Sequence, residues 1–176
     1  MIKMLVRPPA SFATELLIQE GGSATDLSVN GSVTPVEFAY TVPADKIFYL
    51  ARILGVMVDN SITGVKFAGI SALTNGLDLE AKAGTSVLFD FLGGTTVKKN
   101  SDWTLIAGVD MNVGPQADFL GIRYTVTNAG AFMRFNAGQK IVMTVSDNLS
   151  AITEIRFSVQ GLIAPSNTPD SLIQQS

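Results

Sequence analysis

The 176-residue sequence contains no cysteine and no histidine. It therefore cannot form disulfides, the common zinc sites, or a serine or cysteine nucleophile that is activated by histidine. Charged residues are also scarce, at 15% of the chain, where a typical soluble domain has about 25%. A surface with so little charge tends to associate, because little electrostatic repulsion opposes contact. We expect a protein without enzymatic activity that works by binding other chains.

The charge balance and the hydrophobic runs exclude two classes of partner. The chain has 12 basic and 15 acidic residues and a net charge of −3, which offers no basic patch for the phosphates of a nucleic acid. The adjacent pair Lys98 and Lys99 is expected in a solvated loop. No apolar run approaches the roughly 20 residues that a membrane helix needs, and the N-terminal apolar stretch is too short for a signal peptide. We expect a soluble protein, or one that belongs to a soluble assembly.

The first 35 residues differ in composition from the rest of the chain. A short apolar stretch, residues 11–20, precedes fifteen residues that are dominated by Gly, Ser, Thr, Asn and Asp, a composition typical of flexible connections. We predict an N-terminal arm and flexible connection over residues 1–35, which contacts another subunit through the apolar "ELLI". The alternative is that this segment adds an edge strand to its own sheet. A β-sandwich domain would follow over 36–164, and a polar C-terminal tail over 165–176.

From residue 36 onward, apolar and polar residues alternate with a period of two, which indicates half-buried strands. Asn and Gly separate these runs at positions that suit tight turns, because both residues accept positive φ at little cost. We find no convincing long helix. The pattern predicts one all-β domain, an antiparallel β-sandwich or jelly roll, with strands at 36–42, 77–82, 87–91, 122–127, 140–146 and 153–163.

Residues 47–58 pose a problem, because both alternating sets of side chains are apolar and only Arg52 interrupts them. Helical spacing is an alternative, but the β-branched and aromatic content and Gly55 favour a strand. A strand in a solvated antiparallel sheet normally keeps one polar face. We therefore expect the second face to be covered by a neighbouring copy, by the N-terminal arm or by the second sheet. The predicted interface residues are Leu16, Leu17, Ile18, Phe48, Tyr49, Leu50, Ile53, Leu54 and Met57.

Two carboxylates on one predicted strand could form a catalytic pair. Asp78 and Glu80 lie two residues apart and share a face at about 6.5 to 7 Å between Cα atoms. Glycoside hydrolysis requires two carboxyl groups about 5 to 10 Å apart. Alternating outward charges on a strand produce the same spacing, and Lys82 continues this face and would partly neutralise it. We interpret the pair as a solvated face.

Other candidate ligands and stacking groups are weaker. Trp103 could stack on a sugar or anchor an interface, but a core position beside Leu105 is the preferred interpretation. We predict no metal site and no cofactor. Oxygen ligands for calcium could come from Asp102, Asp110, Asn112 and Asp118. Their spacing does not match that of the twelve-residue calcium loop.

Four phrases between Val42 and Gly161 resemble small virion structural proteins of tailed bacteriophages: "VPADKIFYLARI", "GISALTNGLDLE", "LIAGVDM" and "NLSAITEIRFSVQG". The resemblance implies a β-sandwich or jelly-roll fold. The proteins that it resembles include capsid cement or decoration proteins and small tail-module proteins, so the resemblance does not give the position in the virion. Of these we expect a non-enzymatic capsid cement or decoration protein, assembled in the host cytoplasm. Such a protein would form a homotrimer and bind the major capsid protein or other virion proteins.

Two alternatives to a cement protein stay open. A tail, adaptor or host-recognition component could use the same fold. A more remote alternative is a carbohydrate-binding module or glycosidase that uses Asp78, Glu80 or Trp103. The phrases that carry the resemblance are strand and turn sequences, so the resemblance transfers no functional residues.

Overall fold

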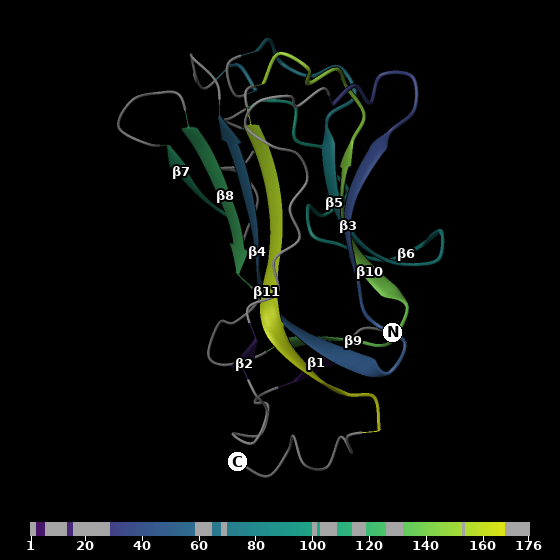
Figure 1. Ribbon diagram of the computed structural model, residues 1–176. Helices are drawn as coiled ribbons and strands as arrows, with labels where there is room; N and C mark the ends of the chain where they lie inside the picture. Colours follow the sequence, from purple (N-terminus) through teal and green to yellow (C-terminus); the bar gives the residue numbers. More distant parts are fainter. Residues whose placement is uncertain are drawn as a thin grey trace.

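The chain forms two antiparallel β-sheets that pack face to face (Figure 1). This arrangement confirms the prediction of an all-β sandwich. The elements assigned in the described part of the chain are all strands, and none of its residues belongs to a helix long and apolar enough to cross a membrane. The computed structural model describes residues 3–5, 14–15, 29–58, 65–67, 70–99, 102, 109–113, 119–125, 132–152 and 154–167.

The larger sheet has seven strands and is built around β4, which pairs with β11 along one edge. Along its other edge β4 pairs first with β9 and then with β8, and β7 extends the sheet beyond β8. The short strands β1 and β2 complete the sheet beside β9 and β11. The bounds are β1 (Lys3–Leu5), β2 (Thr14–Glu15), β4 (Lys46–Val58), β7 (Val109–Val113), β8 (Phe119–Thr125), β9 (Phe132–Phe135) and β11 (Glu154–Pro165).

The smaller sheet has four strands in the order β3-β10-β5-β6. A two-residue hairpin turn joins β5 to β6, and Gly84 occupies its first position with φ 60°. Glycine suits this position because it adopts positive φ without steric cost. In the described sheet, β3 and β6 are the two edges. The bounds are β3 (Val36–Thr41), β5 (Leu77–Ala83), β6 (Ser86–Asp90) and β10 (Gln139–Val145).

The strand interpretation of residues 47–58 is confirmed, and a β-bulge explains why both alternating sets are apolar. The register between β4 and β11 shifts by one residue, so Ala51 has no partner on β11. An extra residue exchanges the two faces of a strand, because side chains alternate with a period of two. Phe48 and Leu50 therefore face the core before the bulge, whereas Ile53 and Met57 face it afterwards.

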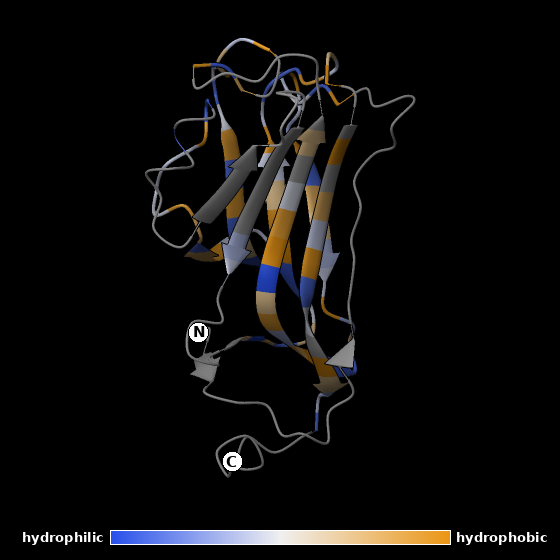
Figure 2. Cartoon of the chain, turned by 90° about the vertical axis from the view of Figure 1, so that its left-hand side faces the viewer, coloured by the Kyte–Doolittle hydropathy of each residue, from blue (hydrophilic) through white to orange (hydrophobic). Residues whose placement is uncertain are grey.

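The first part of β4 is also covered on its opposite face. Ile47 and Tyr49 lie opposite the core-facing residues, yet they are only 2% and 0% exposed. Figure 1 shows the early part of β4 and the late part of β11 bending beneath the smaller sheet, as expected where a bulge bends a strand. Figure 2, which views the larger sheet from outside, shows hydrophobic residues along its central strands with short hydrophilic interruptions.

The regular alternation that we predicted for residues 87–91 is wrong, because a second bulge interrupts it. The register between β5 and β6 shifts at Leu88, which packs against the core. Val87 instead lies opposite Lys82 on the outer face and is 51% exposed. A bulge on an edge strand also hinders pairing with another sheet, because it twists the edge away.

The described parts of the N-terminal segment pair with their own chain. β1 pairs with β9, and β2 pairs with Gly161 and Leu162 of β11. These five residues therefore form edge strands of the larger sheet, which is the alternative stated for this segment. Residues 6–13 and 16–28 lie outside the described part of the chain, and so does the end of the predicted tail, residues 168–176.

Candidate functional site

Most of the predicted interface residues are buried within the chain. Exposure is 2% or less for Phe48, Tyr49, Leu50, Ile53 and Met57, while Leu54 is half-buried. Ile47 and Tyr49, on the second face before the bulge, are covered by their own chain, so this part of β4 does not require a neighbouring copy. Leu16, Leu17 and Ile18 lie outside the described residues. Contact with another subunit stays a prediction.

Asp78 and Glu80 lie on the outer face of the smaller sheet, where an ion-pair network surrounds them. Lys82 binds Glu80 at 3.0 Å and Glu37 at 2.9 Å. Because Glu37 is on β3 and Lys82 is on β5, their ion pair spans β10, which lies between these strands. It helps to cover Val142 of β10, which is 0% exposed although it points away from the core. This face is therefore less solvated than we predicted.

Asp78 is not a partner in the ion pairs of Lys82 with Glu37 and Glu80. Burial raises the pKa of Asp78 above its ordinary value of 3.8, and the negative charges of Glu80 and Asp90 raise it further, against a smaller opposing effect of Lys82. Its cross-strand neighbour Thr144 has a buried hydroxyl with no hydrogen-bond partner among the described residues. Asp78 is therefore a carboxylate whose ionised form is disfavoured by the fold.

We predict that Asp78→Asn raises the melting temperature at neutral pH by about 1 to 3 °C. The pKa of Asp78 is higher in the folded state, so the folded protein binds this proton more tightly than the unfolded chain does. Its contribution to stability is present below pH 3.8 and is lost as the pH rises through the folded-state pKa. Asparagine does not ionise and so avoids this loss. The rise in melting temperature should therefore be largest at neutral pH and should disappear in acid.

Thermal melts between pH 3 and 8 would test this prediction. Asp45→Asn is the matched control, because it makes the same change of charge at an exposed residue that pairs with its neighbour Lys46. A rise in melting temperature for Asp78→Asn that does not depend on pH would contradict the conclusion that the fold disfavours ionised Asp78. The same rise for Asp45→Asn would also contradict it.

The residues considered as calcium ligands do not form a metal site in the described part of the chain. The Asp102 carboxylate accepts hydrogen bonds from the amides of Lys98 and Lys99 and so closes a loop. No group of three described His, Cys, Asp or Glu side chains could hold a metal ion. Asp110 and Asn112 lie on β7, whose side chains are not described, and Asp118 and Trp103 lie outside the described residues.

Sequence analysis missed a surface cleft in the described part of the chain. It has a volume of about 620 Å³ and lies where β6 and the loop after it approach β8 of the other sheet. Three aromatic rings line it, each in contact with the next. The ring centroids are 5.1 Å apart for Phe89 and Phe91, and 5.0 Å apart for Phe91 and Tyr124. The cleft therefore combines side chains from both sheets.

The polar side of the cleft is held in place by hydrogen bonds within the loop of residues 91–98. The Asp90 carboxylate accepts hydrogen bonds from the amides of Leu92 and Gly94 at 2.7 and 2.6 Å. Val97 exchanges backbone hydrogen bonds with Leu77. Fixed in this way, the carboxylates of Asp90 and Asp102 are rigid hydrogen-bond acceptors.

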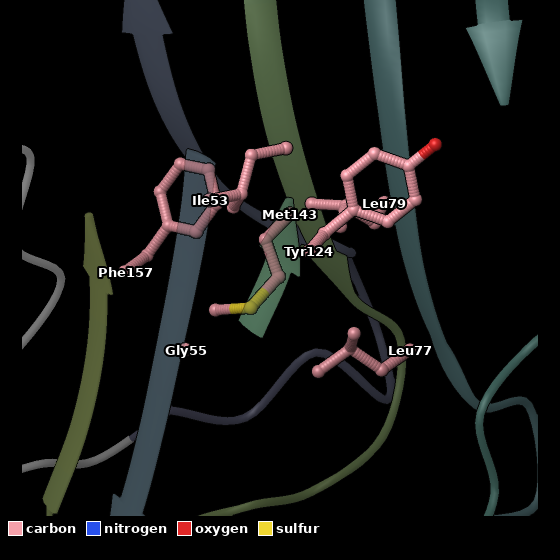
Figure 3. A pocket seen from close by; sticks show the side chains of 7 residues that line it. All are labelled: Ile53, Gly55, Leu77, Leu79, Tyr124, Met143 and Phe157. Atoms are coloured by element: carbon pink, nitrogen blue, oxygen red, sulfur yellow. The ribbon is translucent and has the colours of Figure 1, made fainter. Parts of the chain in front are cut away.

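Tyr124 separates the cleft from the core. Its ring also lines a small cavity of about 10 Å³ between the sheets, together with Ile53, Met143 and Phe157. In Figure 3 its hydroxyl points away from Phe157 and Gly55. Burial raises the pKa of the Tyr124 phenol above its ordinary value, so the hydroxyl stays protonated at neutral pH.

Comparison with known proteins does not assign the chain to a family. A scan against protein-family models, a search of curated proteins and a search of solved structures each found no match. The inference of function therefore rests on the residues, the sandwich and the resemblance of the phrases between Val42 and Gly161.

Proposed function

We propose that this chain is a non-enzymatic structural protein of a tailed-bacteriophage virion. In this proposal it is a capsid cement or decoration protein that binds and stabilises the head. It forms a homotrimer and contacts the major capsid protein or other virion proteins. The resemblance over Val42–Gly161 and the β-sandwich both support the proposal, because such a protein binds through its surface and needs no catalytic groups.

The observation that favours protein contact most is a pair of exposed valines at one end of the sandwich. Val33 is 91% exposed and Val65 is 71% exposed. Val33 precedes the start of β3 and Val65 follows the end of β4, and both of these strand ends lie at the upper end of Figure 1. Each of these valines offers exposed apolar surface that a partner chain could bury. We assign the contact with the particle to this end.

We expect the double variant Val33→Asp and Val65→Asp to bind at least about tenfold more weakly to particles that lack the protein, because each charge must lose water in an apolar contact. The melting temperature should not change, since both side chains are exposed. Val87→Asp, on β6, is the matched control and should bind normally. Normal binding by the double variant would overturn the assignment of this end.

Mass spectrometry of purified particles tests the function itself and separates it from the alternative. A copy number comparable with that of the major capsid protein supports a cement protein. A copy number comparable with that of the tail proteins supports a tail, adaptor or host-recognition component. Absence of the chain from purified particles would overturn both. Light scattering at micromolar concentration tests the trimer separately, and a monomer would contradict it.

A further inference from the structure

The chemistry of the cleft beside β6 distinguishes it from an ordinary surface hollow. Its volume of about 620 Å³ lies within the range of about 300 to 1,000 Å³ that is typical of small-molecule sites. Phe89 is 38% exposed, so part of its ring is available to a ligand. Aromatic rings present apolar surface, and the fixed carboxylates of Asp90 and Asp102 accept hydrogen bonds. The ligand that fits carries both apolar C–H groups and several hydrogen-bond donors.

The charges around the cleft exclude an acidic ligand. Asp90 and Asp102 both line it, whereas the cation Lys98 donates its ammonium hydrogen to the carbonyl oxygen of Thr74 at 2.7 Å. A phosphate or carboxylate would therefore meet two negative charges and only one positive charge. A neutral ligand avoids this repulsion and can donate hydroxyl hydrogens to both carboxylates.

Further polar groups in the cleft suit a ligand with hydroxyl groups. Thr96 lines the cleft, and its hydroxyl can both donate and accept hydrogen bonds. The Tyr124 hydroxyl is protonated at neutral pH and can do the same. Thr95 is less available, because its hydroxyl donates to the carbonyl oxygen of Leu92 at 2.7 Å. These groups match alternating hydroxyl donors and acceptors around a sugar ring.

We propose that the cleft between β6, the loop of residues 91–98 and β8 is a binding site for a neutral carbohydrate. A sugar ring lies with its C–H face against Phe89, and its hydroxyl groups donate to the carboxylates of Asp90 and Asp102. This site differs from the pair Asp78 and Glu80, which lies on the outer face of the smaller sheet, where Glu80 is paired with Lys82. Binding here requires no catalysis and does not depend on assembly into a particle.

Nuclear magnetic resonance on the isolated full-length chain tests this proposal. Glucose, galactose, mannose, N-acetylglucosamine and their disaccharides would each be titrated, with glucuronate as the charged comparison. We expect at least one neutral sugar to give saturable shifts at Phe89, Gly93 and Thr96, with glucuronate binding at least about tenfold more weakly. The absence of shifts at these residues for every neutral sugar would overturn the proposal.

Three variants test whether the sugar binds in the cleft. Phe89→Ala removes the stacking surface, and Phe89→Leu removes the ring but keeps an apolar side chain if the alanine variant folds poorly. Both should weaken binding at least about tenfold, because the C–H face of the sugar loses the aromatic ring against which it packs. Val87→Ala changes an exposed apolar residue of the same strand outside the cleft and should bind like the wild type. Unchanged sugar binding by Phe89→Leu would overturn the proposal that the sugar packs against Phe89. Because this experiment uses the isolated chain, its outcome is independent of whether the chain is found in particles.

Discussion

Gly161→Ala is expected to destabilise the fold by about 3 kcal/mol or more. A Cβ atom at this position would lie 2.1 Å from the carbonyl oxygen of Tyr49 and 2.7 Å from Cζ of Phe48. Both atoms belong to β4, which pairs with β11 on either side of the bulge. The carbonyl oxygen cannot move away without separating the two longest strands of the larger sheet, so the strain has no inexpensive release.

Urea denaturation measures this effect, and Gly138→Ala provides the control. A Cβ atom at Gly138 meets nothing within 4 Å, but the residue has φ 77°. Its substitution should therefore cost only the roughly 1 to 2 kcal/mol of a left-handed conformation. A loss for Gly161→Ala no greater than that of the control would show that the close approach of the strands is relaxed in solution.

Asp147→Ala is expected to cost about 2 to 4 kcal/mol, because it leaves several amides without their acceptor. Asp147 is only 8% exposed. Its carboxylate accepts hydrogen bonds from the amides of Thr74, Asn75 and Gly76, at distances between 2.7 and 3.2 Å. The loop before β5 is thereby tied to the loop after β10, at the end of the sandwich that carries Val33 and Val65.

The control for Asp147→Ala is its neighbour. The Asn148 side chain accepts hydrogen bonds from the amide and the hydroxyl of Ser150, within one exposed turn. Asn148→Ala should therefore cost about 1 kcal/mol or less. Equal losses for the two variants in urea denaturation would mean that the Asp147 carboxylate does not hold the two loops together. Amide hydrogen exchange at Thr74 to Gly76 should also accelerate in Asp147→Ala alone.

Strand alternation was predictable wherever the register is regular. The apolar set of β11 faces the core as the pattern predicts, with Ile155, Phe157 and Val159 at most 1% exposed. β10 follows the same rule through Ile141 and Met143. These strands were readable because one face is buried against the other sheet, and this selects alternating apolar residues. The short strands β7 and β9 were not predicted.

The pattern of β4 could be seen in the sequence but not explained from it. Two apolar faces on one strand are consistent with a partner chain, a covering arm or a change of face. Only the pairing with β11 shows that Ala51 is an extra residue and that the faces exchange there. A bulge is a property of two paired strands, so one strand read alone does not reveal it.

The sequence by itself determined the class of fold and excluded several chemistries. The absence of cysteine and histidine removes disulfides and the common zinc sites, and period-two alternation specifies strands. Tertiary structure alone decided where the candidate sites lie. Phe89 and Tyr124 are far apart in sequence and were both predicted as strand residues, yet they line one cleft because the two sheets approach there. Such a site depends on which strands of the two sheets pack close together in space. The local pattern of apolar and polar residues carries no information about that packing.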